Sequence, residues 1–525
     1  MHDLLDAPLL ELPGGDFLCH RDLAQNVFVT GVTGGGKTSG PGRHLLEALL
    51  KSGDGGIVLC AKPTEAAEIR ALCAKVGRLG SLIEWNGRNH GFNFLAYAMA
   101  RMGQDGTNGL VEYLMRVVEM IRSASPMTGS NGDAFWLDAL RVLLRYSVPV
   151  VYAATGSLSI ASLIAFVRSA PVSPEQFHDP EWQRQEPFFM RCFVAATARM
   201  DAATCQQMAA YWQQDFARMD AKLRSNIIAG FMLLDRFNHG WLKDALCGAT
   251  TISPALCFAG AIIVLDMSRA VLGDDGIIAQ LIFKEAWQRE VLGRNALPPI
   301  YRERFTFCYG DECQEFIASS DADFLAMSRS SRAATIYLTQ ALPQIYYKLG
   351  GPDAQHRAHS VIANLGIRFY CANNCVETNK WASEAIGKAV QYRHSHGQSS
   401  GSSSQFGMNM GEGTNWGFNS GSGGSSGYSS GSGGSSHSGG SSWSSGSSRG
   451  GSDSWGRNRG TSTNHGQNWG QNEVVDYLLE PGQFSRMLKT GGPRHGNRVS
   501  AILHVAGRRF AASGGNSMIV EFAQR

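Results

Sequence analysis

The sequence of 525 residues contains no apolar run long enough to cross a membrane. A membrane-spanning helix needs about 20 mostly apolar residues, and the most apolar stretch, Pro254 to Leu265, is shorter. The N-terminus carries acidic residues early and lacks the apolar core of a signal peptide. We therefore expect neither a transmembrane segment nor a secretory signal.

The chain also lacks an excess of charge of one sign and any CxxC pair. Its 47 Lys and Arg residues against 44 Asp and Glu residues give a net charge of +3. A DNA-binding domain usually has a clear basic excess, so composition alone does not indicate nucleic acid, although it leaves room for a locally basic channel. The eleven cysteines are scattered, which favours reduced thiols in a cytosolic protein over disulfides or a metal site.

Large apolar residues are scarce in one stretch, residues 395–472, which consists mainly of Gly, Ser, Asn and Gln with spaced aromatic residues. Such a stretch cannot bury enough apolar surface to offset the entropy lost on ordering. We predict that it is disordered. It would serve as a flexible linker or, because aromatic residues in such a background can cluster, as a self-association segment.

The first strong pattern is a strand, a glycine-rich loop, a helix and a second strand within about 35 residues. The run from Val27 to Thr30 is apolar and β-branched, and the run from Gly56 to Cys60 has the same character. Leucines at helical spacing lie between them. This order is typical of a βαβ unit and predicts a parallel sheet.

The loop of this unit, GVTGGGKT, fits the phosphate-binding pattern G-x-x-x-x-G-K-[ST] in full. Backbone N–H groups would bind phosphate oxygens, Lys37 would reach the β- and γ-phosphates, and Thr38 would ligate Mg²⁺. An ordinary glycine-rich turn is the alternative, which the position between strand and helix disfavours. The predicted nucleotide-binding residues are Gly31, Val32, Thr33, Gly34, Gly35, Gly36, Lys37, Thr38 and Ser39.

Directly after this loop, Gly40-Pro41-Gly42 falls in the first turns of the expected helix. Proline is tolerated in a helix only near its start. We therefore expect the helix to be bent or delayed at this point.

Strands resume after a long stretch that reads as helical. Apolar residues at helical spacing fill residues 104–245. The pattern predicts an all-α insertion there, between a first part of the NTPase core at residues 1–103 and a second part at 246–394, with the remainder of the core at 473–525. The later strands are expected at 261–265, 305–309, 334–338, 367–371, 499–505 and 517–522, with a helix at 277–291.

An acidic pair follows one of these strands, in the sequence FTFCYGDE. The strand would deliver Asp311 to the carboxyl edge of the sheet beside the phosphate-binding loop, where it would hold Mg²⁺ directly or through water. Glu312 would polarise the attacking water as a general base. Gln340 ends the next strand and would lie beside Asp311, where it can sense the γ-phosphate; a glutamine satisfied at a strand end is the alternative.

Two arginines precede that strand. Arg329 or Arg332 would act as an arginine finger that reaches a neighbouring subunit's nucleotide and stabilises charge in the transition state, unless both are solvated surface residues. Lys62 and Glu65, after the second strand, would line the site or a subunit boundary.

Five segments, taken in order, resemble the coupling-protein ATPases of conjugation and type IV secretion, which are TraG/TraD-like members of the FtsK/HerA group of DNA pumps. Two features narrow the resemblance to this group: the Lys-x-x-Glu pattern at Lys62 and Glu65, and the Thr339-Gln340 pair. The segments are VFVTGVTGGGKTSGPGRHLLEALL, GGIVLCAKPTEAAEI, FTFCYGDECQEF, SRSSRAATIYLTQALPQI and NLGIRFYCANNCVETNKWASEAIGK, and DAFWLDALRVLL and YLLEPGQFSRMLKTGG match the family's helical domain and tail.

The resemblance implies a RecA-like α/β core with a mainly parallel sheet, ATP and Mg²⁺ as ligands, and a hexameric ring whose channel passes DNA. It implies nucleotide roles for Lys37, Thr38, Asp311, Glu312 and Gln340, and a cargo-selecting role for the all-α domain. Relaxase or secretion-channel proteins are the expected partners.

Family members usually carry N-terminal transmembrane helices, whereas here the phosphate-binding loop begins 30 residues in. We therefore expect a soluble, cytoplasmic ring that meets the inner membrane only through partners. Two alternatives stay open: an ATP-gated recruitment scaffold without motor activity, and a HerA-like pump that serves DNA processing or defence.

Overall fold

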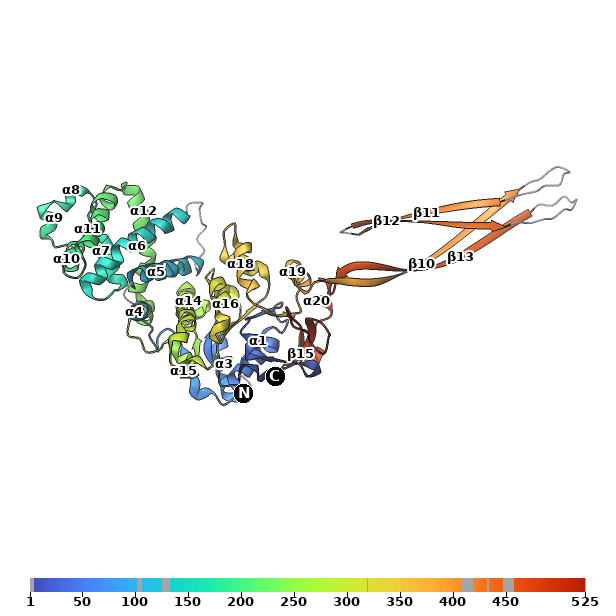
Figure 1. Cartoon of the computed structure of the whole chain (residues 1–525), viewed down its shortest axis with the longest axis horizontal. Helices are drawn as coiled ribbons and strands as arrows, with labels where there is room; N and C mark the ends of the chain where they lie inside the picture. Colours follow the sequence, from blue (N-terminus) through green and yellow to red (C-terminus); the bar gives the residue numbers. More distant parts are fainter. Residues whose placement is uncertain are drawn as a thin grey trace. The chain divides into compact units, whose positions relative to one another are not determined.

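The computed structural model describes residues 4–101, 106–124, 133–318, 320–407, 419–431, 434–446 and 458–524. These residues form two compact units. One consists of Met1–Lys388 together with Tyr477–Arg525, and the other of Ala389–Asp476. Figure 1 labels many of their helices and some of their strands.

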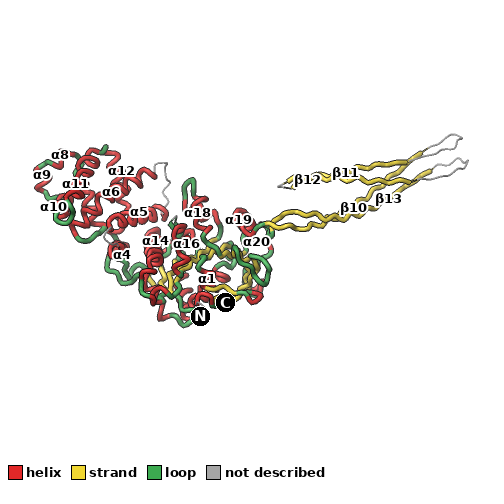
Figure 2. Tube along the Cα trace, viewed as in Figure 1, coloured by secondary structure: helices red, strands yellow, loops and turns green. Residues whose placement is uncertain are grey.

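In the first unit the described residues form a nine-stranded sheet with the strand order β15-β14-β9-β3-β8-β7-β4-β6-β5. Figure 2 shows strands of this unit, in yellow, lying among its helices, in red. The strands from β9 to β5 are parallel, and β14 runs antiparallel to both β9 and β15. The predicted mainly parallel sheet is confirmed. The bounds are β3 (Val27–Thr30), β4 (Gly55–Leu59), β5 (Leu82–Trp85), β6 (Ile262–Leu265), β7 (Thr306–Gly310), β8 (Ala333–Thr339), β9 (Ile367–Cys371), β14 (Arg498–Val505) and β15 (Ser517–Ala523).

Successive side chains of a strand point to opposite faces of the sheet, and an apolar core covers each face of the parallel strands. In β3, Phe28 belongs to one apolar core, while Val27 and Val29 belong to the other. The second core is completed by leucines of α2 (Arg43–Lys51) and by α3 (Glu65–Lys75). The strands therefore read as continuous apolar runs, which is why the sequence pattern located them.

The first core lies on the other face of the sheet. Helices of the insertion and helices that follow β6 both contribute to it, and α14 begins earlier than predicted, with a break at Gly273. A third, small cluster joins α19 to α20 and β14. The helices that follow β6 are α14 (Arg269–Gly293), α15 (Pro299–Arg302), α16 (Asp321–Ser328), α17 (Leu342–Leu349), α18 (Ala354–Ala363), α19 (Val376–Ile386) and α20 (Gln483–Arg486).

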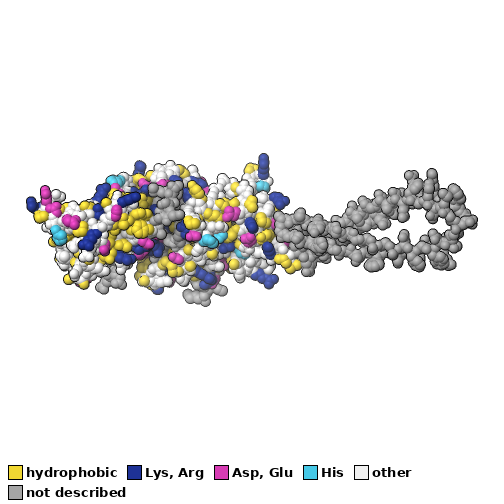
Figure 3. All heavy atoms as spheres, turned by 90° about the horizontal axis from the view of Figure 1, so that it is seen from above, with side chains coloured by type: hydrophobic (Ala, Val, Ile, Leu, Met, Phe, Trp, Pro, Cys, Tyr) yellow, Lys and Arg dark blue, Asp and Glu magenta, His cyan; other side chains and the backbone are white. Residues whose placement is uncertain are grey.

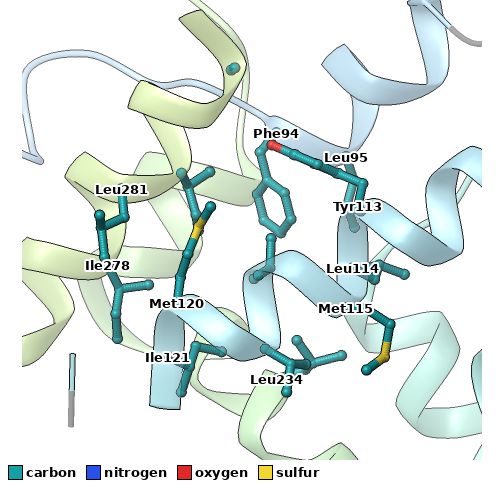
Figure 4. Packing of buried hydrophobic residues seen from close by; sticks show 14 of the residues in the cluster. Phe94, Leu95, Tyr113, Leu114, Met115, Met120, Ile121, Leu234, Ile278 and Leu281 are labelled. Carbon is teal, nitrogen blue, oxygen red and sulfur yellow. The ribbon is translucent and has the colours of Figure 1, made fainter. Parts of the chain in front are cut away.

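Between β5 and β6 the described residues are mostly helical, as predicted for the insertion. Figure 4 shows how it joins the core: Met120 and Ile121 of α5 pack beside Ile278 and Leu281 of α14. The domain limits at residues 104 and 245 stay predictions. The helices are α4 (Phe94–Arg101), α5 (Gly106–Ala124), α6 (Asp133–Thr155), α7 (Ile160–Arg168), α8 (Pro174–Phe177), α9 (Pro180–Arg184), α10 (Phe188–Ala196), α11 (Ala202–Ala210), α12 (Ala221–Phe231) and α13 (Gly240–Cys247).

The chain begins with elements that the sequence analysis did not predict. A hairpin of β1 (Pro8–Glu11) and β2 (Phe17–Cys19) leads into the single turn α1 (His20–Leu23). These strands are too short for a recognisable alternation of apolar residues, and β5 is equally short.

The second unit differs from the predicted disorder of residues 395–472. The described residues there adopt strand geometry: β10 (Lys388–Gly407) pairs with β13 (Asn458–Tyr477), and β11 (Asn419–Gly431) pairs antiparallel with β12 (Gly434–Gly446). Strand pairing needs only backbone N–H and C=O groups, which a Gly/Ser chain offers at every residue. Apolar burial is therefore not required for this pairing. The other residues of this stretch lie outside the described ones.

No single helix in the described ranges is both long and apolar enough to cross a membrane. One bent pair of helices, Phe135–Thr155 with Ile160–Arg168, satisfies length and composition together, at an angle of 113°.

The surface shown in Figure 3 has Lys and Arg side chains interspersed with Asp and Glu. No extended patch of one sign is visible on this face, in keeping with the small net charge.

Candidate nucleotide site

The phosphate-binding loop joins β3 to α2 at the carboxyl edge of the sheet. Gly34 and Gly36 have φ angles of 75° and 85°, a left-handed conformation that residues with a Cβ rarely adopt. A Cβ at Gly35 would lie 2.8 Å from a carbonyl oxygen of the same loop, and one at Gly31 would lie 2.8 Å from the Cβ of Cys371. The glycines are therefore required by the backbone shape and by close packing.

Strands that come much later in the sequence fix the loop in place. The N–H of Val32 donates a hydrogen bond to the carbonyl oxygen of Ala372, just after β9, at 2.9 Å. Gly36 packs so closely against Val499 of β14 that a Cβ there would clash with it. Thr33 is exposed at the loop's tip. The last part of the chain is thus needed to shape a loop near its beginning.

The expected bend after the loop is present. Residues Thr38–Gly42 form a π-helical turn, and Gly40 departs from helical geometry with φ −96° and ψ −111°. A Cβ at Gly42 would lie 2.6 Å from Cδ2 of Leu338 and 2.8 Å from the hydroxyl of Tyr309. Close contact with the sheet therefore explains why glycines flank the proline.

The acidic pair lies directly against the loop. Asp311 and Glu312 follow β7, and both are buried. The hydroxyl of Thr38 donates to Oδ2 of Asp311 at 2.8 Å, and Nζ of Lys37 lies 3.2 Å from Oε1 of Glu312. Glu312 has a left-handed backbone, with φ 51°, and its N–H donates to Oδ1 of Asp311 at 2.9 Å. The structure thus brings these four predicted residues together.

Two glutamine amides hold the carboxylate of Glu312. Nε2 of Gln340 donates to both of its oxygens, at 3.2 and 3.3 Å, and Nε2 of Gln314 donates at 2.9 Å. The hydroxyl of Thr339 in turn donates to Oε1 of Gln314 at 2.9 Å. Sequence reasoning missed Gln314, whose only signal is its place two residues after the acidic pair.

These contacts determine the charge state of Glu312. Burial alone would raise its pKa, but the hydrogen bond from Gln314, the charge of Lys37 and the hydrogen bond from Gln340 lower the pKa to about 2. The charge of Lys62 acts in the same direction. Glu312 is therefore ionised at neutral pH, as a water-polarising carboxylate must be.

Lys62 and Glu65 line this same site. Nζ of Lys62 lies 3.2 Å from Oδ2 of Asp311 and 3.2 Å from Oε1 of Glu312. Oε2 of Glu65 accepts hydrogen bonds from the backbone N–H groups of Ala61, at 2.7 Å, and Lys62, at 3.2 Å. Burial and the negative charge of Asp311 raise the pKa of Glu65 to about 7. Lys62 is thus a second lysine beside the acidic pair, in addition to Lys37.

The two candidate finger residues lie at the other edge of the sheet. Arg329 and Arg332 precede β8, whereas Gln340 follows its carboxyl end. Seven residues of strand span roughly 20 Å, so neither guanidinium is near the phosphate-binding loop of its own chain. Nη1 of Arg332 donates to the carbonyl oxygen of Glu303 at 3.0 Å. A role toward a neighbouring subunit stays a prediction.

A cavity of about 330 Å³ opens beside the phosphate-binding loop. The last described residue, Gln524, reaches into it, and its Nε2 donates to Oγ of Ser39 at 2.7 Å. Sequence reasoning missed Gln524, because nothing local connects it to a loop 485 residues earlier. The lining residues are Gly34, Gly36, Lys37, Thr38, Ser39, Arg43, Leu46, Glu68, Ile69, Leu72, Tyr309 and Gln524.

The donors present fit Mg²⁺. The hydroxyl of Thr38 and the carboxylate of Asp311 are hard oxygen ligands that lie 2.8 Å apart beside the loop. The described residues contain no cluster of three or more His, Cys, Asp or Glu side chains suited to a metal ion. That is expected of a site where the protein supplies one or two ligands and nucleotide phosphates and water supply the rest.

The fold is a RecA-like α/β core, and the loop between β3 and α2 has the sequence and the backbone geometry of a P-loop. Residues 306–487 match the family model described as the TraM recognition site of TraD and TraG. Comparison with curated protein sequences gives no match. The family match covers the part of the chain that carries the acidic pair, Gln314 and Gln340.

Solved structures of a conjugative coupling protein share the fold. The unbound form of TrwBdeltaN70 aligns over 99% of this chain and 91% of its own, with 14% identity and a TM-score of 0.55. TrwB with a non-hydrolysable ATP analogue aligns over the same shares, with 14% identity and a TM-score of 0.53. With the family match, these confirm the resemblance to TraG/TraD-like coupling proteins.

Proposed function

We propose that the protein is an ATP-hydrolysing coupling ATPase of the conjugative type, which moves or remodels DNA, or a DNA–protein substrate, through a ring. The observation that carries this proposal is the contact set around Glu312. A buried carboxylate lies beside the phosphate-binding lysine and is oriented by two amides. A protein that only bound nucleotide would not need an oriented base next to its phosphate site.

Each site residue has a part in this function. The loop's N–H groups and Lys37 hold the phosphates, and Glu312 orients and polarises the attacking water. Mg²⁺, held by Thr38 and Asp311, would neutralise charge on the phosphates. Gln340 contacts Glu312 and lies two residues before the start of α17, so it is placed to transmit the state of the nucleotide to the helices that follow.

The proposal extends to the assembly and its partners. The resemblance supports a homo-hexamer with a DNA channel, and the matched region supports contact with relaxosome or secretion-channel proteins. All eleven cysteines are unpaired in the structure, which suits a reducing cytoplasm. We propose that the ring works there, peripheral to the inner membrane where partners recruit it.

The test is ATP turnover by purified protein with and without DNA, alongside particle size. A coupling ATPase forms a ring-sized particle and hydrolyses ATP faster when DNA is present. Turnover that DNA of any form leaves unchanged contradicts the motor and favours the recruitment scaffold. Genes for a relaxase or a secretion channel beside this one would separate a role in transfer from one in DNA processing or defence.

A further inference from the structure

Lys62 lies between the two acidic side chains of the site. Its Nζ is 3.2 Å from Oδ2 of Asp311 and 3.2 Å from Oε1 of Glu312. The two carboxylates belong to consecutive residues and are both buried. Two buried like charges so close together repel each other unless a cation lies between them. The ammonium of Lys62 supplies that cation.

A divalent cation bound by Asp311 would need the same oxygen. Oδ2 of Asp311 accepts hydrogen bonds from the hydroxyl of Thr38 and from the ammonium of Lys62. A metal ion at about 2.1 Å from this oxygen would lie within a few ångströms of the ammonium, and the two positive charges would repel each other strongly. Lys62 and the metal ion therefore compete for one position.

Glu65 offers Lys62 a second position. Its Oε1 is buried and has no hydrogen-bond donor among the described residues, yet it lies only 3.6 Å from Nζ of Lys62. Its Oε2 is held by two backbone N–H groups, so the carboxylate is fixed in place. The side chain of Lys62 is 47% exposed, which leaves its long stem room to rotate. A small movement would bring the ammonium to the unsatisfied oxygen.

We propose that Lys62 is a positioning residue that competes with the divalent cation for Asp311 and Glu312, and that Glu65 receives its ammonium when the cation binds. The proposal rests on the assignment of Asp311 as the metal-holding residue of the proposed ATPase. In this arrangement the acidic pair is neutralised at every stage. Glu312 loses its bond to Lys62 when the cation binds, so the base is released in the metal-loaded site.

The test measures Mn²⁺ binding to the full chain without nucleotide, by electron paramagnetic resonance. Lys62→Met removes the competing ammonium and should tighten Mn²⁺ binding roughly three- to tenfold. Lys75→Met is the matched control, because Lys75 is 40% exposed and pairs with Glu47 away from the acidic pair. Affinity that is unchanged or weaker in Lys62→Met, or equally increased in Lys75→Met, overturns the proposal.

Glu65→Gln tests the second position. The amide oxygen can still accept the two backbone hydrogen bonds, but the charge that attracts Lys62 is lost. Mn²⁺ binding should weaken several-fold in the native background and change little when Lys62 is already methionine, since Glu65 then has no ammonium to receive. Equal weakening in both backgrounds would mean that Glu65 acts on the metal ion directly, and its proposed role would fall.

These outcomes are separate from the test of the overall function. Mn²⁺ affinity is read without ATP and without DNA, so a protein that DNA fails to stimulate can still show the competition. Conversely, unchanged Mn²⁺ affinity in Lys62→Met would leave a DNA-stimulated ATPase intact as a conclusion. Lys62→Gln should behave as Lys62→Met does, and thermal unfolding of each variant verifies that the fold is retained.

Discussion

At the scale of single residues, Glu312 combines burial with an unusually complete set of partners. Lys37, Gln314 and Gln340 each contact its carboxylate, and together they hold its pKa near 2. A carboxylate with so low a pKa is a weak base. When Lys37 turns to the phosphates, its contribution is lost and the basicity of Glu312 rises. Nucleotide binding itself would thus activate the base.

Glu312→Gln should keep nucleotide binding and lower ATP turnover about 10²- to 10⁴-fold, the usual contribution of a general base. The amide has nearly the same shape, so the loop should stay in place. Glu315→Gln is the matched control, because Glu315 pairs with Arg269 and Lys348 instead of the loop. Steady-state turnover and nucleotide affinity are the measurements. Near-normal turnover in Glu312→Gln would remove its assignment as the base.

Lys37→Ala should abolish nucleotide binding, and with it turnover. Lys37 is 5% exposed, lies next to the acidic pair and has the only long cationic side chain within the loop itself. Without it, the phosphates lose their main charge partner. Binding of a fluorescent ATP analogue measures the effect. Lys51→Ala, at the exposed end of α2, should bind normally, and tight binding by Lys37→Ala would contradict the placement of the phosphates.

At the scale of elements, the phosphate-binding loop depends on contacts that no local pattern reveals. The loop pattern, the acidic pair and Gln340 could be predicted because each follows a strongly apolar strand. Val499 and Gln524 could not, because their relation to the loop arises only when β14 and β15 join the sheet beside β9. The strand pairing of the Gly/Ser stretch was missed for a related reason, since backbone pairing leaves no apolar signature.

Gly42→Ala tests the close packing after the loop. A Cβ there would press on Leu338 and on the hydroxyl of Tyr309, so the substitution should lower the free energy of unfolding by about 1–3 kcal/mol. Gly80→Ala is the matched control, because a Cβ at Gly80 would meet no atom within 4 Å. Denaturant unfolding compares the two. Equal stability of both variants would show that α2 can shift away from β8 without cost.

At the scale of the whole molecule, the position of the two arginines is informative. Arg329 and Arg332 lie at the edge of the sheet opposite to Gln340, so a finger role requires a second subunit. Which of the two reaches the neighbouring nucleotide depends on how subunits pack in the ring.

Mixing two inactive variants tests the ring. A subunit with Lys37→Ala keeps its arginines, and a subunit with Arg329→Ala or Arg332→Ala keeps its nucleotide site. If one arginine acts in trans, mixed rings should regain part of the turnover that each variant lacks alone. When each arginine variant is mixed with Lys37→Ala, turnover should be restored only for the variant that lacks the finger arginine. If both arginine variants keep normal turnover, neither residue is the finger.

The most direct test of the central claim is the rate of ATP hydrolysis as DNA is added to the native chain. A coupling ATPase should show turnover that rises severalfold and saturates with DNA, in a ring-sized particle, and that disappears in Glu312→Gln. A rate that stays flat with single- and double-stranded DNA would contradict the claim, and the protein would then be a nucleotide-gated scaffold.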